Sequence, residues 1–243
     1  MTVRAAVFAS GRGSNFQVLA EYGRRPSTAW DVALLVTDRP DAPVLARARE
    51  LSVPAEVLPP GDDPDTYPDR LLSRLEAASV DMVLLAGYLR LVPVELVRRY
   101  RGRMINLHPA LLPAFGGKGM YGGRVHEAIL AAGSRVSGVT IHLVDEAYDR
   151  GRILAQWPVP VLPDDTPQTL ANRIHAVEHR LYPAVADELA RAIAAGEAPR
   201  VGPSSEGHFH FSSTTPAFPV PGASAVPESG EGERSASDRG ARP

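Results

Sequence analysis

Two side chains that suit acyl transfer, Asn106 and His108, lie two residues apart at the end of an apolar segment. In a β-strand, residues i and i+2 point to the same face, so the amide and the imidazole are predicted to lie side by side. Both donate hydrogen bonds that stabilise the oxygen that becomes negative when an amine attacks a carbonyl carbon. A histidine near a strand end is also commonly structural, so these two residues alone leave both catalysis and plain hydrogen bonding open.

A glycine-rich turn near the N-terminus suits a second task, the binding of an anion. Residues 10–15 are Ser-Gly-Arg-Gly-Ser-Asn, and such small residues let the chain turn into a helix whose free N–H groups attract phosphate. Phe16 stands where a third glycine would complete a dinucleotide-binding motif, and no Gly-Lys-Ser/Thr follows. We therefore expect phosphate rather than a dinucleotide here, with a plain tight turn as the alternative.

The segments around these residues alternate between apolar strands and amphipathic helices. Strands are predicted at 3–9, 32–37, 55–58, 82–86, 104–107, 136–144 and 153–161. Helices are predicted directly after residue 15 and at 42–51, 67–78, 93–99 and 124–132. Continuous apolar strands between helices indicate a parallel sheet covered on both faces. The predicted fold is α/β, a Rossmann-like doubly wound, mostly parallel sheet.

A long helix is predicted after Thr166, which serves as its N-cap, with Pro167 as its first residue. Its buried stripe is predicted to comprise Leu170, Ile174, Val177 and Leu181. From about residue 203 the composition changes to Ser, Pro, Gly, Glu and Arg, which cannot bury enough apolar surface to fold. We therefore expect a catalytic domain over 1–202 and a disordered tail over 203–243.

Composition narrows the class of partner. The 243 residues carry a formal net charge of -2 without basic blocks, which argues against nucleic acid and membrane surfaces and favours small molecules. There is no cysteine, no apolar run of membrane-spanning length and no recognisable signal peptide. We expect a cytoplasmic protein, either a monomer or a homodimer.

Four segments, at 11–15, 85–90, 106–113 and 142–149, together resemble the phosphoribosylglycinamide formyltransferase family in order and spacing across residues 1 to about 200. The Asn-x-His-Pro-x-Leu-Leu-Pro block that begins at Asn106 is similar to the signature of folate-dependent formyltransferases in general. The Gly-Ser-Asn turn at 13–15 points to the purine-pathway branch. The resemblance implies formyl transfer from 10-formyltetrahydrofolate to the amine of 5-phosphoribosylglycinamide, the third step of de novo purine synthesis, with no metal.

The same resemblance implies a role for each residue of the reaction centre. His108 is the expected general acid, Asn106 holds the formyl oxygen, and Asp149 raises the pKa of His108 and assists proton transfer. A loop carboxylate paired with Arg150 or Arg152 is the alternative for Asp149. His142 is either close to the reaction centre or a packing residue.

The resemblance also implies two binding regions. The folate is expected to contact Leu89, Arg90, Leu91, Val92, Asn106, Asp145, Glu146, Ala147, Tyr148 and Asp149. The phosphorylated substrate is expected to contact Gly13, Ser14, Asn15 and Glu178, the last through its amine. Arg90 as a solvated charge and Glu178 as a polar-face residue are the alternatives.

Two features depart from the family pattern. Some members carry an arginine shortly before the equivalent of Tyr67, where this chain has Asp-Pro-Asp-Thr at 63–66, so that folate contact is in doubt. The glycine loop at 116–123 is longer than in some relatives, and we expect a mobile flap in which Lys118 either binds phosphate or is solvated.

Three other functions stay open on the sequence alone. A tRNA or sugar-nucleotide formyltransferase normally adds a C-terminal substrate domain, and a formyltetrahydrofolate hydrolase usually adds an N-terminal regulatory one. A non-catalytic metabolite-binding protein on the same scaffold would keep the glycine turn but would not need Asn106, His108 and Asp149 together.

Overall fold

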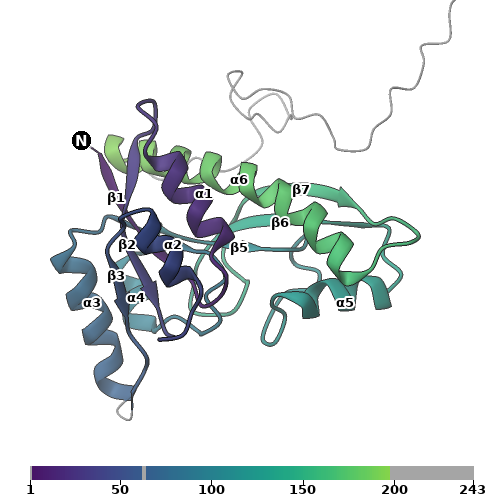
Figure 1. Ribbon diagram of the computed structural model, residues 1–243, viewed down its shortest axis with the longest axis horizontal. Coiled ribbons are helices and arrows are strands. Elements are labelled where there is room, and N and C mark those ends of the chain that lie inside the picture. The colour runs from purple at the N-terminus through teal and green to yellow at the C-terminus, as the bar shows by residue number, and fades with distance from the viewer. Residues whose placement is uncertain (1, 62–63, 198–243) are drawn as a thin grey trace, which may run out of the picture. The chain divides into compact units, whose positions relative to one another are not determined.

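The computed structural model describes residues 2–61 and 64–197, all within one compact unit, Met1–Gly202. The tail predicted at 203–243 lies outside the described residues. The unit is built on a seven-stranded sheet in the order β3-β2-β1-β4-β5-β6-β7 (Figure 1). The strands are β1 (Val3–Phe8), β2 (Trp30–Thr37), β3 (Ala55–Val57), β4 (Met82–Leu85), β5 (Met104–His108), β6 (Val136–Leu143) and β7 (Ile153–Pro160).

Strands β1 to β5 pair in parallel, and β6 and β7 continue the sheet antiparallel. The chain builds outward from β1 in one direction and then returns to add β4 on its other side. The carboxyl ends of β1 and β4 therefore flank the point where the strand order reverses, which is where open α/β sheets bind ligands. The predicted doubly wound, mostly parallel sheet is confirmed.

Helices cover both faces of this sheet (Figure 1). On one face lie α1 (Ser14–Gly23), α2 (Val44–Glu50) and α6 (Pro167–Ala195), with α5 (Gly123–Ala131) packed against α6. On the other lie α3 (Tyr67–Ala77), which follows the short 3-10 helix η1 (Pro64–Thr66), and α4 (Val94–Arg99). Among the described residues, no helix is both long and apolar enough to cross a membrane.

Burial on both faces explains why the central strands are uninterrupted apolar runs. In β1, Ala5, Ala6, Val7 and Phe8 have no exposed surface. Alternate residues point to opposite helical layers, so each one needs an apolar side chain. The structure differs from the predicted boundaries by a residue or two: β2 begins at Trp30 instead of 32, and α2 at Val44 instead of 42.

Helix α6 begins as predicted and buries three of the four residues of the predicted stripe, Leu170, Ile174 and Leu181. The Thr166 side chain accepts from the N–H of Thr169, whose hydroxyl accepts from the N–H of Thr166, so the helix opens on a reciprocal capping box. Along the buried face, Glu178 takes the place predicted for Val177, which is only half-buried. Both positions fit the helical spacing, and the valine was the expected one because an unpaired buried carboxylate is costly. Glu178 is buried because it has a partner in the site.

Candidate active site

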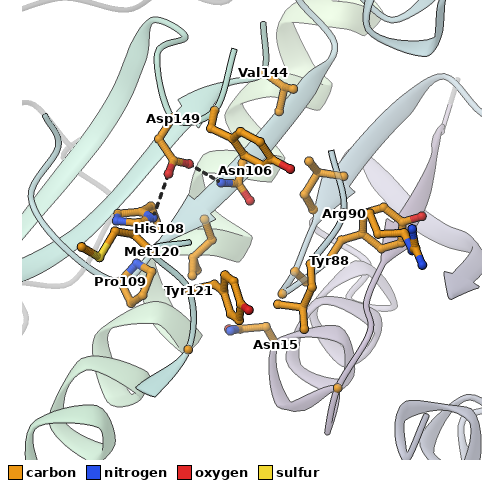
Figure 2. A pocket seen from close by; sticks show the side chains of 18 of the residues that line it. Asn15, Tyr88, Arg90, Asn106, His108, Pro109, Met120, Tyr121, Val144 and Asp149 are labelled. Carbon is orange, nitrogen blue, oxygen red and sulfur yellow. Dashed lines mark hydrogen bonds and ion pairs between the residues drawn. The ribbon is translucent and has the colours of Figure 1, made fainter. Parts of the chain in front are cut away.

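A cavity of about 390 Å³ lies along the carboxyl ends of β1, β4 and β5, where the strand order reverses. Its wall is built by the segments that follow these three strands, by the loops before α5 and after β6, and by one face of α6. Figure 2 shows the side chains that enter it from these separate elements. The sheet therefore brings together residues that are far apart in the sequence.

Asn106 and His108 lie in the second half of β5, His108 as its last residue, and point to the same side, as the strand spacing predicted. The antiparallel pairing of β5 with β6 places His142 directly opposite Asn106, with 3.1 Å between His142 Nε2 and Asn106 Nδ2. His142 Nδ1 lies 2.8 Å from the Leu143 carbonyl and must donate to it, so Nε2 is the acceptor. This contact fixes the orientation of the Asn106 amide.

The Asn106 amide lies against two acceptors at the edge of the cavity. Asn106 Nδ2 also lies 3.4 Å from Asp149 Oδ1, and this oxygen is 3.5 Å from His142 Nε2. Asn106 lines the cavity, so a negative oxygen that develops there can compete with these two acceptors for the amide hydrogens.

Asp149 lies where all these groups converge. Its Oδ2 accepts from the Gly117 N–H at 2.9 Å and is 3.6 Å from His108 Nδ1 (Figure 2). Its backbone has a φ of +54°, in the left-handed region that few residues other than glycine adopt and that aspartate and asparagine tolerate best. Burial alone would raise the pKa of Asp149, but the nearby imidazoles and the hydrogen bond from the Gly117 N–H hold that pKa below its usual value. Asp149 is therefore a carboxylate at neutral pH.

Both ring nitrogens of His108 face acceptors. Nε2 donates to the Phe115 carbonyl at 2.8 Å, and Nδ1 faces Asp149. Burial lowers the pKa of His108 below its usual value and outweighs the opposing effects of Asp149 and of the Phe115 carbonyl. Asp149 raises the pKa of His108, as predicted, but burial is the larger effect and makes the net shift a lowering. A negative charge that develops beside the ring adds to the effect of Asp149 and shifts the balance toward the imidazolium.

The glycine-rich turn after β1 forms an open helix terminus at the other end of the cavity. Gly13 is the N-cap of α1 with a φ of +74°, and no side chain of the described residues caps this end. A Cβ atom at Gly13 would collide with Val44, so only glycine fits. The first N–H groups of α1 therefore face the cavity beside Ser14 and Asn15, and the helix dipole adds positive charge there.

Glu178 joins α6 to this turn. Its carboxylate is 2% exposed and accepts from Asn15 Nδ2 at 2.8 Å, and it lines the cavity. Burial raises the pKa of Glu178, and the nearby His175 and the Asn15 amide partly oppose this effect. Glu178 is therefore not a solvated residue on the polar face of the helix, which was the alternative.

The wall expected to hold the folate is present with one exception. The loop after β4 lines the cavity with Leu89, Arg90, Leu91 and Val92, and the leucine side chains are 43% and 50% exposed. Of residues 145–149, the exception is Glu146, which lies outside the cavity lining and pairs with Arg98 at 3.2 Å. Lys118 also lies outside the lining. Residues 62 and 63 lie outside the described residues. Asp63 is the first residue of the Asp-Pro-Asp-Thr segment that departs from the family pattern.

Sequence reasoning missed the contacts made by backbone groups. The Phe115 carbonyl and the Gly117 N–H hold His108 and Asp149, and Phe115 adopts a φ of +55°. It also missed His126 of α5, a buried imidazole that lines the cavity and whose Nδ1 has no hydrogen-bond partner among the described residues. The glycine pair at 116–117 was the available signal, because it permits close backbone approach to Asp149.

Comparison with known proteins gives consistent matches. The model of the formyl transferase family matches residues 3–186. The chloroplastic phosphoribosylglycinamide formyltransferase of Vigna unguiculata is 48% identical over 76% of this chain and 60% of its own length. The phosphoribosylglycinamide formyltransferase of Bacillus subtilis is 39% identical over 76% of this chain and 93% of its own length.

Solved structures agree with these matches. The crystal structure of glycinamide ribonucleotide transformylase 1 from Geobacillus kaustophilus superposes with a TM-score of 0.72 at 42% identity, over 78% of this chain and 100% of that one. The chain spans about 60% of the length of the plant relatives that it matches. Since the family match covers all seven strands and most of α6, this chain belongs to the formyl transferase family.

Proposed function

We propose that the protein transfers the formyl group of 10-formyltetrahydrofolate to the amine of 5-phosphoribosylglycinamide. The observation that carries the proposal is the joining of three features in one cavity. These are the cluster of Asn106, His108 and Asp149, the N-terminus of α1 without a side-chain cap from the described residues, and the apolar wall after β4. The names of the Vigna and Bacillus relatives support the choice of substrates.

The two substrates would enter from different sides. The phosphate would bind the N–H groups of Gly13, Ser14 and Asn15, where the helix dipole and the glycine turn favour an anion. Glu178 would attract the amine in its ammonium form, which in turn stabilises the buried carboxylate. The pterin ring would lie against the wall at 89–92 and the loop at 145–149, and its formyl group would lie beside Asn106.

The reaction forms one C–N bond and breaks another. The neutral amine attacks the formyl carbon, and the carbonyl oxygen becomes negative while it receives hydrogen bonds from the Asn106 amide and from His108. His108 Nε2 donates to the Phe115 carbonyl in the structure, so it would make this bond either by sharing its hydrogen or by releasing that carbonyl. Asp149 accepts a proton from the amine, directly or through water, and passes that proton to N10 of the folate as the C–N10 bond breaks, so the protons balance.

The test is an absorbance assay of folate with purified protein, 10-formyltetrahydrofolate and phosphoribosylglycinamide. Deformylation that requires the amine substrate supports the transferase, whereas deformylation without it identifies a hydrolase. No reaction with both substrates would leave a binding protein. His108→Ala is expected to abolish turnover while circular dichroism and binding of a phosphate ligand stay as in the wild type.

A further inference from the structure

The loop after β4 has to hold exposed leucines in a fixed place without belonging to a helix or a strand. Residues 86–93 lie between β4 and α4, and Gly87 turns the chain with a φ of +79°. Leu89 and Leu91 have roughly half of their surface exposed. A loop of this kind needs anchors from its neighbours to keep its shape, because no hydrogen-bonded ladder supports it.

Ser10, the second residue after β1, forms two hydrogen bonds with the loop and a third with Asp38. It is 1% exposed. Its N–H donates to the Gly87 carbonyl at 3.1 Å, and its Oγ accepts from the N–H of Leu89 at 3.2 Å. The same hydroxyl donates to Asp38 Oδ1 at 2.6 Å. Ser10 therefore uses its donor and an acceptor position to connect the loop to a buried carboxylate.

Asp38, the residue after β2, holds the next position along the loop. Its side chain is 7% exposed, and its second oxygen, Oδ2, accepts from Arg90 Nε at 2.9 Å. Arg90 is 51% exposed, and its guanidinium points away from Asn106 and His108 (Figure 2). One carboxylate thus connects the ends of β1 and β2 with the loop after β4. Arg90 is not the free surface charge that the sequence left as an alternative.

Tyr88 fixes the loop independently on its other side. Its hydroxyl lies 2.6 Å from that of Tyr67, and its ring packs edge-on against Phe8 with centroids 5.2 Å apart. Loss of the Asp38 contacts should therefore displace residues 89–92 without unfolding the loop.

We infer that Ser10 and Asp38 are positioning residues for the folate: through Leu89 and Arg90 they set the distance between the apolar wall and the reaction centre. The inference rests on the proposed function, because it assigns the wall to the folate. Among the described residues, neither Ser10 nor Asp38 forms a hydrogen bond or ion pair with Asn106, His108 or Asp149. Their effect should thus fall on folate binding and spare the chemical step.

The test is Asp38→Asn, which keeps an acceptor for Ser10 and replaces the partner of Arg90 by a neutral group. A charge-assisted hydrogen bond is lost, and we expect the KM for 10-formyltetrahydrofolate to rise by roughly tenfold. The KM for phosphoribosylglycinamide and kcat should stay within about twofold of the wild type, because the α1 terminus and the reaction centre are unchanged. Asp41→Asn is the matched control, since Asp41 lies close to Asp38 in the sequence and forms an exposed ion pair with Arg39.

A double-mutant cycle tests the route of the effect. If Asp38 acts through Arg90, Asp38→Asn combined with Arg90→Gln should raise the folate KM no further than the stronger single variant does. Additive effects, equal rises in both KM values, or no rise in the folate KM would each overturn the inference. Calorimetric titration with tetrahydrofolate separates the two hypotheses. A wild-type protein that neither binds folate nor turns over would contradict the proposed function. An active wild-type protein with an Asp38→Asn variant of unchanged folate affinity would contradict only the positioning role.

Discussion

Replacement of Asp149 by asparagine removes a charge at the reaction centre with little change in shape. Asparagine tolerates the left-handed backbone at this position and can still accept from the Gly117 N–H. The fold should therefore persist, with the midpoint of thermal unfolding close to that of the wild type. What disappears is a carboxylate 3.6 Å from His108 Nδ1 that is only 11% exposed.

The cost of this change follows from the distance. One unit charge at that separation stabilises an imidazolium by about 4.6 kcal/mol at an effective dielectric constant of ~20. At ~1.4 kcal/mol for each factor of ten, loss of that interaction lowers kcat by roughly a thousandfold, before any loss of proton acceptance is added. The KM values should change much less, because asparagine keeps the shape of the loop at 145–149 and leaves the N-terminus of α1 unchanged.

Steady-state kinetics with both substrates, together with urea denaturation, measure these quantities. The reasoning would be refuted by an Asp149→Asn enzyme that is folded and retains more than about a tenth of the wild-type kcat. A variant that is inactive because it is unfolded would instead show that the charge stabilises the fold. Asp41→Asn, which removes an exposed carboxylate, serves as the control for a general effect of charge.

Three further outcomes are expected. Gly13→Ala places a Cβ 2.7 Å from that of Val44 at a φ of +74°, so the free energy of unfolding should fall by about 1–3 kcal/mol and the KM for phosphoribosylglycinamide should rise, as denaturation and kinetics would measure. His126→Leu tests how acid affects the stability of the fold. Burial, with smaller effects from His175 and His108, lowers the pKa of His126 to about 4. The unfolded chain therefore binds a proton at this residue near pH 6.5, whereas the folded chain does not. Wild-type stability should therefore decrease as the pH falls through that window, and the variant should lose about 2 kcal/mol less between about pH 7.5 and about pH 5 in urea denaturation. Thr166→Ala removes the N-cap of α6 and should lower the free energy of unfolding by about 1 kcal/mol without changing kcat; an unchanged midpoint would show that the capping box is not needed.

Much of the scaffold could be predicted because local signals agree with it. The apolar runs of β1, β2, β4 and β5 alternate with helices, and Thr166-Pro167 marks the start of α6. The same-side placement of Asn106 and His108 follows from the two-residue period of a strand. The return to β4, which creates the cavity, also follows from general rules for doubly wound sheets.

The pairing of distant groups could not be predicted from local patterns. His142 faces Asn106 only because β6 pairs with β5 in one register, and sequence periodicity does not contain that register. The burial of Glu178 depends on a hydrogen bond from Asn15, which lies more than 160 residues away. Backbone groups such as the Phe115 carbonyl carry no side-chain identity, so their contacts appear only in three dimensions.

The two edges of the sheet have a consequence for association between chains. An exposed edge strand offers unpaired N–H and C=O groups to other molecules and invites aggregation. At one edge, β3 has three residues. At the other, the N–H of Val161 donates inward to the Arg135 carbonyl, so alternate residues, including Pro158 and Pro160 of β7, direct their backbone nitrogens outward, where proline has no hydrogen to donate. Growth of the sheet from one molecule to the next is therefore blocked at β7 and limited to a short segment at β3.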